Sequence, residues 1–248
     1  MAHRDCPFPG GHARSTASTA VPDSGIGAIL ISSRSLPEYR AMFSLTERDL
    51  RRRILDCPGG AASLTAELNA VGGDVTACDP VYADTTAERL ATLTQGETAR
   101  ANRYIRAHPE QYRWSAFASP DDHYQSRSAA GARFAADRCA HPERYVPGAL
   151  PHLPFGDGVF DLVLSSHLLF AFADRLDYAF HYAGILELIR VTGTELRIFP
   201  LVAMAATVPY PRLEQLRTEL ANAKVITRVV DVDYEFQTGG NQMLVCTR

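Results

Sequence analysis

The sequence contains no run of about 18 consecutive apolar residues and no apolar segment of the kind that forms the core of a signal peptide. Both absences argue against a membrane-spanning or secreted protein. The five cysteines include no C-x-x-C pair, and Cys57 and Cys78 fall in segments expected to be buried. Buried free thiols fit a reducing compartment, so we expect a soluble cytoplasmic protein that makes no contact with a membrane.

An excess of either charge is also absent. Lysine and arginine together number 25 against 28 acidic residues, which gives a formal net charge of −3. A nearly neutral chain creates no long-range field that would attract nucleic acid or an anionic membrane. The histidines and cysteine near the start, His3, Cys6 and His12, have nothing to fix them in a ligand geometry, so we predict no metal site.

The chain has enough apolar residues for a sizeable core. Its 248 residues, 46% of them hydrophobic, fit one domain that carries an inserted subdomain. Residues 1–25 are rich in Ala, Gly, Ser, Thr and Pro, a composition typical of a flexible tail. We therefore predict a tail over residues 1–25 and a folded domain over residues 26–248.

The most informative stretch is residues 53–64, RILDCPGGAASL. Ile54 and Leu55 predict the end of a buried strand, Asp56 lies at its carboxyl edge, and a helix is expected from Ala61. The intervening Pro-Gly-Gly turn permits positive φ and close approach of a ligand to the backbone. Free amide groups at the start of the following helix favour an anionic group. This pattern predicts a cofactor-binding turn.

A second acidic residue lies at the end of the next predicted strand. Residues 74–79, DVTACD, predict a short strand that ends at Asp79, 23 residues after Asp56. An acid at the tip of the second strand of such a unit accepts hydrogen bonds from ribose hydroxyls. The spacing therefore indicates a nucleoside-containing cofactor.

Three segments together carry a family resemblance: ILDCPGG at 54–60, VTACDP at 75–80 and LPFGDGVFDLVLSSHLLF at 153–170. In this order they resemble the class I S-adenosylmethionine (SAM)-dependent methyltransferases, over about residues 39–248. The resemblance implies an α/β fold with a seven-stranded, mostly parallel sheet, helices on both faces and a C-terminal antiparallel hairpin. It implies SAM as cofactor.

The resemblance also assigns cofactor-binding residues. Asp56 would orient the turn and the methionine ammonium, while Tyr39 and Met42 either line the methionine end of SAM or simply pack their helix on the sheet. The family commonly places an acid after the third strand to meet adenine, and this chain offers only backbone there. The full predicted set is Tyr39, Asp56, Cys57, Gly59, Gly60, Asp79, Pro80, Ala149, Leu150, Ser165 and Ser166.

The end of the fourth predicted strand, residues 160–165, carries the polar triplet Ser165, Ser166 and His167. Ligands of open α/β sheets bind at this edge. We predict His167 as a general base or hydrogen-bond partner for the acceptor, since a neutral imidazole can take a proton from a nucleophile. The alternative is a histidine whose ring is satisfied by backbone in a structural turn.

The connection between the second and third strands is unusually long. Residues 83–142 predict helices over 85–93, 99–108 and 129–139, with an aromatic and polar stretch around Tyr112, Trp114, Phe117 and His123. This insertion could be a lid that recognises substrate or the interface of a homodimer. At the other end of the domain, residues 225–236 and 243–247 predict a hairpin with its turn at Gly239 and Gly240.

We therefore expect methyl transfer from SAM to an O- or N-nucleophile of a small-molecule acceptor. The alternatives are an RNA or protein methyltransferase, a catalytically silent SAM-binding interaction module, and a nicotinamide-dependent oxidoreductase. The near-neutral charge argues against the first, together with the lack of an Asn/Asp-Pro-Pro-Tyr/Phe motif at residues 165–168. The terminal hairpin argues against the last.

Overall fold

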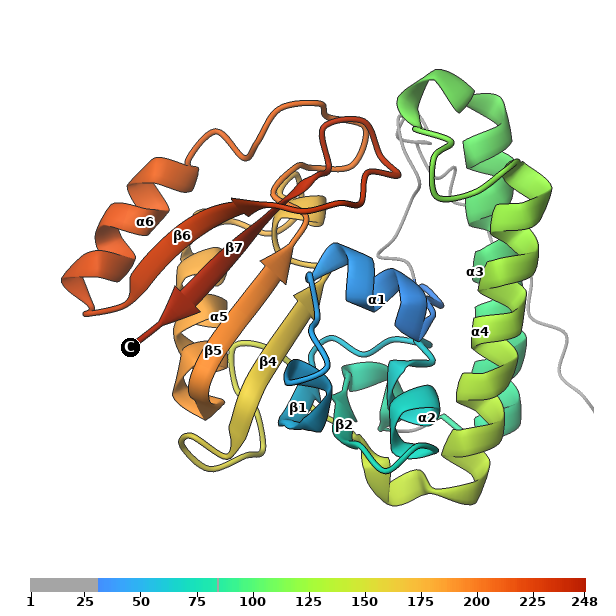
Figure 1. The fold of residues 1–248 in the computed structure, drawn as a ribbon, viewed down its shortest axis with the longest axis horizontal. Coiled ribbons are helices and arrows are strands. Elements are labelled where there is room, and N and C mark those ends of the chain that lie inside the picture. Colours follow the sequence, from blue (N-terminus) through green and yellow to red (C-terminus); the bar gives the residue numbers. More distant parts are fainter. Residues whose placement is uncertain (1–30, 84) are drawn as a thin grey trace, which may run out of the picture.

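The computed structural model describes residues 31–83 and 85–248. The predicted tail over residues 1–25, with His3, Cys6 and His12, lies outside this range. The strands form one seven-stranded sheet of order β3-β2-β1-β4-β5-β7-β6 (Figure 1). They are β1 (Arg53–Asp56), β2 (Asp74–Cys78), β3 (Tyr145–Val146), β4 (Phe160–Ser166), β5 (Thr192–Phe199), β6 (Ile226–Asp231) and β7 (Gln242–Thr247).

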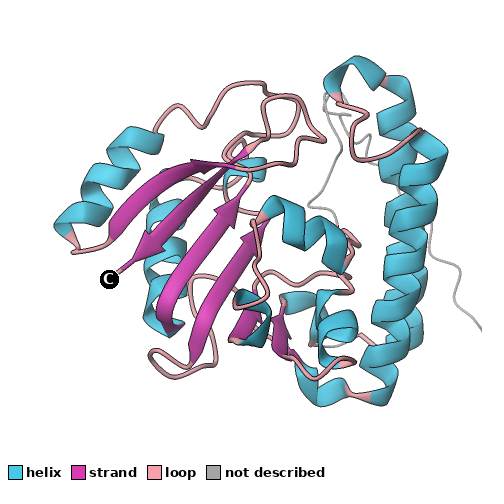
Figure 2. Ribbon diagram, in the orientation of Figure 1, coloured by secondary structure: helices cyan, strands magenta, loops and turns pink. Residues whose placement is uncertain are grey.

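The longer helices pack around this sheet and beside it (Figure 2). They are α1 (Leu36–Met42), α2 (Leu64–Asn69), α3 (Ala87–Ala107), α4 (Pro120–Ala140), α5 (Tyr178–Val191) and α6 (Leu213–Asn222). No helix within the described ranges has both the length and the apolar character needed to cross a bilayer.

Strand direction confirms the predicted fold class. Neighbouring strands from β3 through β5 pair in parallel, whereas β7 pairs antiparallel with both β5 and β6. Parallel strands require crossover helices on the faces of the sheet, while the two antiparallel strands come from a terminal hairpin. The described chain thus has the class I methyltransferase-like architecture, mostly parallel with a C-terminal antiparallel hairpin.

Alternation along the strands divides the core into two layers. Leu55 and Val163 face a cluster built with α5 and α6, whereas Ile54, Leu162 and Leu164 face a cluster that includes α1 and α2. Successive side chains of a strand point to opposite faces, so apolar runs such as FDLVL can fill both layers. The carboxyl ends of β1, β2 and β4 are thereby held together at one edge.

The insertion is more regular than predicted. The two helices expected over 85–93 and 99–108 form one helix, α3, and α4 begins at Pro120 rather than at residue 129. Gly96 is tolerated inside α3, because one glycine weakens a helix without ending it. The N-cap hydroxyl of Ser119 accepts from the Asp122 amide at 3.1 Å and begins α4 early. The two helices pack side by side beside α1 and α2 (Figure 1).

The C-terminal hairpin also differs from its prediction. The strand expected over 225–236 ends at Asp231, and residues 232–241 form a loop. This loop pairs with the insertion instead of β7: the Arg113 amide donates to the Phe236 carbonyl at 2.7 Å, and the Thr238 amide donates to the Gln111 carbonyl at 2.9 Å. The backbone groups of the loop are thus satisfied by a segment distant in sequence, a pairing that local periodicity does not show.

Candidate active site

Two cavities open at the carboxyl edge of the sheet. The first, which we call the turn cavity, has a volume of ≈ 940 Å³ and is walled by the glycine turn, Asp79 and residues 148–150. The second, the aromatic cavity, has a volume of ≈ 900 Å³ and lies between the insertion, β5 and the 232–241 loop. Both cavities are lined by Ile31, Ser32, Arg34 and His167. The two spaces therefore adjoin at these four residues.

The glycine turn has its shape for reasons internal to the protein. A Cβ on Gly59 would lie 2.8 Å from both the Cβ of Ala77 and the hydroxyl of Tyr82, so the turn packs directly on β2. Gly60 has φ +52°, a conformation that favours glycine. Helix α2 then begins at Leu64 rather than at the predicted Ala61. Both glycines line the turn cavity.

Asp79 joins the tip of β2 to the turn. Its Oδ2 accepts from the Gly60 amide and its Oδ1 from the Val81 amide, each at 2.9 Å. Burial raises the pKa of Asp79, whereas these two amide hydrogen bonds act in the opposite direction. A carboxylate oxygen has more than one acceptor position, so both oxygens can still receive hydroxyl donors from the cavity.

Asp56 lies beneath the cavity wall rather than on it. The side chain is 1% exposed, and both of its oxygens accept from the Tyr39 hydroxyl at 3.0 Å. Burial raises the pKa of Asp56 to about 8, against the opposing effect of the Tyr39 hydrogen bond. The unliganded site therefore holds a largely protonated carboxyl group near neutral pH, and a cation in the cavity would favour its ionised form.

A chain of hydrogen bonds continues from Tyr39 to His167. The Ser166 hydroxyl contacts His167 Nδ1 at 2.8 Å and also hydrogen-bonds Tyr39. With Asp56 ionised, Tyr39 donates to it, and Ser166 can then donate to Tyr39 and accept from His167 Nδ1–H. In that tautomer His167 Nε2 carries no proton and can act as an acceptor.

His167 has further constraints that hold it at the junction. Its φ is 51°, a rare conformation for a residue other than glycine, and its amide donates to the Phe199 carbonyl at 2.7 Å. Burial, followed by the nearby charge of Arg34, lowers the pKa of His167 well below its ordinary value. The ring is therefore neutral at pH 7 and half-buried between the two cavities.

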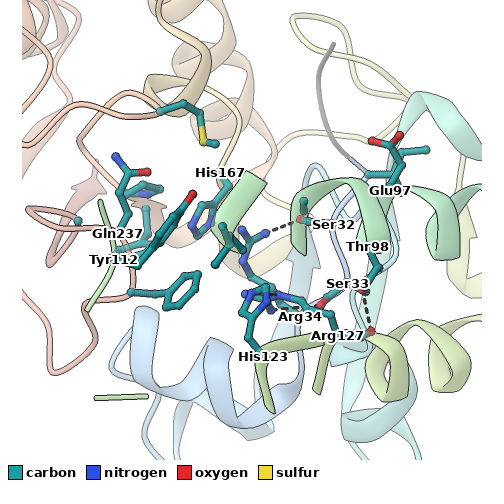
Figure 3. A pocket seen from close by; sticks show the side chains of 18 of the residues that line it. Ser32, Ser33, Arg34, Glu97, Thr98, Tyr112, His123, Arg127, His167 and Gln237 are labelled. Carbon is teal, nitrogen blue, oxygen red and sulfur yellow. Dashed lines mark hydrogen bonds between the residues drawn. The ribbon is translucent and has the colours of Figure 1, made fainter. Parts of the chain in front are cut away.

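The aromatic cavity is walled by rings from three parts of the chain. His123 of α4 stacks on Phe236 with centroids 4.7 Å apart, and Tyr112 lies 4.8 Å from the same ring (Figure 3). Phe199 of β5 and Tyr234 complete the apolar wall near His167. The insertion supplies Tyr112 and His123 and so forms part of the cavity wall.

A buried ionic network fixes this wall. Arg127 pairs with Glu38, and its Nη1 also donates to the Ser33 carbonyl at 3.1 Å. The other Glu38 oxygen accepts from the Tyr234 hydroxyl at 2.9 Å. These contacts join α4, α1 and the 232–241 loop, and they neutralise the Arg127 charge.

The structure gathers most of the residues predicted from the sequence. Asp56 and Ser165 lie behind the wall. Met42 is fully buried in the core, which agrees with the second of its two predicted roles, packing its helix on the sheet. The predicted residues that line the turn cavity are Tyr39, Cys57, Gly59, Gly60, Asp79, Pro80, Ala149, Leu150, Ser166 and His167.

Sequence reasoning missed Arg34 and the pairing of Arg127 with Glu38. Arg34 directly precedes the helix-capping Ser35, and its burial follows only from tertiary packing. The aromatic stretch of the insertion was a usable signal for the second cavity, since it contains both Tyr112 and His123. Within the described residues, no group of three His, Cys, Asp or Glu side chains could hold a metal ion.

Comparisons with known proteins give one sequence relative and several solved structures of low similarity. No protein-family model matches the chain. An uncharacterized protein of Methanocaldococcus jannaschii is 28% identical over 220 residues, which cover 88% of this chain and 96% of that protein.

Two solved structures are similar at low identity. A magnesium protoporphyrin IX methyltransferase from Synechocystis PCC 6803 with bound SAM gives a TM-score of 0.45 at 12% identity, covering 85% of this chain and 77% of that chain. A SAM dependent methyltransferase from Aquifex aeolicus gives 0.39 at 14% identity, covering 78% and 80%.

Proposed function

We propose that this protein is a SAM-dependent methyltransferase that acts on an O- or N-nucleophile of a small-molecule acceptor. The observation that carries the proposal is the junction of the turn cavity with the aromatic cavity at His167. A cofactor in the first and an acceptor in the second would meet at a neutral histidine. Ligands of open α/β sheets bind at this edge, outside the carboxyl ends of the strands.

The residues of the turn cavity fit the parts of SAM. Asp79 would accept from the ribose hydroxyls, and the backbone and side chains of residues 148–150 would pack on adenine. Asp56 would become ionised beside the methionine ammonium, either directly or through water, because a nearby cation favours the carboxylate.

The protein's own chemical contribution would be modest. SAM, when bound, supplies an electrophilic methyl group on a sulfonium. The cavity walls would align the acceptor and exclude water, and His167 Nε2 would take the proton from a neutral nucleophile. Ser166 would hold the proton of His167 on Nδ1, which keeps Nε2 available.

Isothermal titration with S-adenosylhomocysteine, with NAD and NADP as controls, tests this proposal. We expect micromolar affinity for S-adenosylhomocysteine and no measurable binding of either nicotinamide cofactor. Binding of NAD instead would favour the oxidoreductase alternative, and binding of none of the three would contradict the proposal. Tight binding without turnover on any acceptor pool, bulk RNA and protein included, would favour a silent SAM-binding module.

Asp79→Ala should weaken S-adenosylhomocysteine binding at least about tenfold, because two charge-assisted hydrogen bonds to ribose would be lost. Asp74→Ala, at the exposed start of the same strand, is the matched control and should leave the affinity unchanged. Circular dichroism would verify that both variants are folded. Unchanged affinity in folded Asp79→Ala would remove the ribose assignment.

A further inference from the structure

Arg34 carries a charge that the described protein does not neutralise. The one hydrogen bond of its guanidinium is from Nη1 to the Ser32 hydroxyl, and its Nε is buried without a partner. It forms no ion pair with any described carboxylate, whereas the neighbouring Arg127 is paired with Glu38. Arg34 is half-buried, and a partly desolvated guanidinium without a direct ion pair is costly. Burial, followed by the Arg127 charge, lowers its pKa to about 10, against the opposing effect of the Glu38 charge.

The position of Arg34 makes this charge available to a ligand. Figure 3 shows the Arg34 side chain among the residues that line the aromatic cavity, with its hydrogen bond to Ser32. The residue lines both cavities, and its positive charge contributes to the lowered pKa of His167 after the effect of burial. A negatively charged group at Arg34 would therefore lie at the junction where the transferred methyl group is expected.

His123 supplies a second donor without a partner. Its Nε2 accepts from Arg127 Nε at 3.1 Å, so the neutral ring carries its proton on Nδ1, and that atom is buried and unbonded. Burial lowers the pKa of His123 to about 2, which keeps the ring neutral. His123 is 4% exposed, and of the two cavities it lines only the aromatic cavity. His123 therefore brings to the wall of the aromatic cavity a buried N–H donor that no described group satisfies.

The two donors and the walls between them define a ligand chemistry. Arg34 and His123 offer N–H groups and no acceptor, which suits a carboxylate that can receive several hydrogen bonds. The one acid that lines the aromatic cavity, Glu97, is paired with Arg100 at 2.6 Å and so adds little opposing charge. The remaining surface is largely aromatic and apolar, from Tyr112, Phe199 and Phe236.

We propose that the acceptor is a small carboxylic acid with an apolar or aromatic body, held through its carboxylate by Arg34 and His123 in the aromatic cavity. This inference rests on the proposed methyltransferase function and names its substrate class. The competing source of a carboxylate is the methionine end of the cofactor, which Arg34 could also reach. His123 does not line the turn cavity, and this difference favours the acceptor.

The test uses protein saturated with S-adenosylhomocysteine and titrated with benzoate, 3-phenylpropionate and octanoate, each beside its uncharged primary amide. At least one acid should bind at least about tenfold more tightly than its amide, as expected when a charge-assisted hydrogen bond is lost. If no acid exceeds its amide, the proposal is overturned. Failure of S-adenosylhomocysteine itself to bind would instead contradict the methyltransferase proposal.

Variants locate the binding site of the acid. Arg34→Met and His123→Phe should each weaken binding of the acid at least about tenfold. Arg103→Met, on the exposed surface of α3, should leave the affinity for the acid unchanged. His123→Phe keeps an aromatic ring against Phe236 and removes both the Nδ1–H donor and the acceptor of the Arg127 Nε hydrogen bond. Affinities that stay at the wild-type value in both folded variants would overturn the proposal.

A second titration distinguishes the cofactor as the source of the carboxylate. Methylthioadenosine lacks the amino-acid end of S-adenosylhomocysteine, so comparing the two compounds isolates binding of the cofactor carboxylate. If Arg34 binds the acceptor, Arg34→Met should change the affinity for each compound by less than about twofold. A selective loss of S-adenosylhomocysteine binding of about tenfold or more would assign Arg34 to the cofactor and overturn the acceptor site.

Discussion

At the scale of single residues, His167 combines a positive φ, a neutral ring and a hydrogen bond between its Nδ1 and the Ser166 hydroxyl. Residues held in sparsely populated backbone conformations cluster at functional sites. His167→Asn is the appropriate variant, because asparagine tolerates the same backbone conformation and cannot act as a base at this pH.

His167→Asn should retain S-adenosylhomocysteine affinity within about twofold and lose methyl transfer by about a hundredfold or more, the usual contribution of a general base. The measurement is transfer of labelled methyl from SAM to the carboxylic acid that binds most tightly. Ser166→Ala, which frees the Nδ1 proton, should reduce transfer by a smaller factor. Wild-type turnover in His167→Asn would show that the histidine has only a structural role.

Asp56 makes a pH-dependent contribution to stability. Its folded pKa, about 8, lies above the ordinary value of 3.8, so the folded state holds a proton that the unfolded chain releases. The stability from this proton is complete below about pH 4 and is lost as pH rises through about 8. Asp79, whose pKa is also raised by burial, acts in the same direction.

We therefore expect the free energy of unfolding of the unliganded protein to fall between about pH 6.5 and about pH 8.5, and to fall less steeply in Asp56→Asn. In this window His123 and His167 are neutral when folded. When unfolded, a histidine with an ordinary pKa of about 6.5 is half protonated at the lower end and largely neutral above about pH 7.5, where the Asp56 slope is cleanest. Urea unfolding at several pH values measures the slope of the unfolding free energy against pH for each protein. Equal slopes in the two proteins would mean that Asp56 is ionised in the free site.

Single-residue features were predictable where local pattern encodes them. Gly60 and Asp79 follow from a turn and a strand end, and the structure gives them the expected backbone conformation and edge position. Arg34 was not predictable, because an arginine beside a helix cap is usually solvated and nothing local indicates that its charge will be buried. Its role depends on the packing of the insertion against α1.

At the scale of elements, the insertion is attached to the domain through a buried ion pair. Arg127 of α4 and Glu38 of α1 are 6% and 7% exposed, and Tyr234 completes the Glu38 hydrogen bonds. Removing one partner of such a pair leaves a buried charge without compensation. The attachment of α4, and with it the wall of the aromatic cavity, should therefore depend on Glu38.

Glu38→Gln should lower the free energy of unfolding by about 3–5 kcal/mol, the range for a broken buried pair. Glu47→Gln is the matched control, since its pair with Arg40 is exposed and should contribute less than about 1 kcal/mol. Replacing both partners, as Glu38→Leu with Arg127→Met, should recover part of the loss. Urea unfolding measures all three, and equal effects of Glu38→Gln and Glu47→Gln would contradict this account.

Element boundaries show the limit of local reasoning. The strands β1, β2 and β4 lie where apolar runs predicted them, because strands buried on both faces need such runs. The end of β6 and the extent of α3 and α4 depend on partners distant in sequence, such as the Arg113 to Phe236 hydrogen bond. The shift at β6 is consequential, since the loop that replaces the predicted strand carries Tyr234 and Phe236.

At the scale of the whole molecule, the order of segments was sufficient to predict the sheet. The resemblance carried by residues 54–60, 75–80 and 153–170 implied a seven-stranded sheet with a terminal hairpin, and strand pairing confirms it. The aromatic cavity was beyond this reasoning, because it is assembled from the insertion, β5 and the 232–241 loop. The prediction of a homodimer through residues 83–142 stays open and is compatible with the exposed face of α3.

The most direct test of the account is a crystal structure of the protein with S-adenosylhomocysteine. The account predicts electron density for the ligand in the turn cavity, with its ribose hydroxyls on Asp79, its adenine against residues 148–150 and its sulfur facing His167. The aromatic cavity should remain free to receive an acceptor. Density for the nucleoside in the aromatic cavity beside His123, or a ribose away from Asp79, would contradict the assignment of the two cavities.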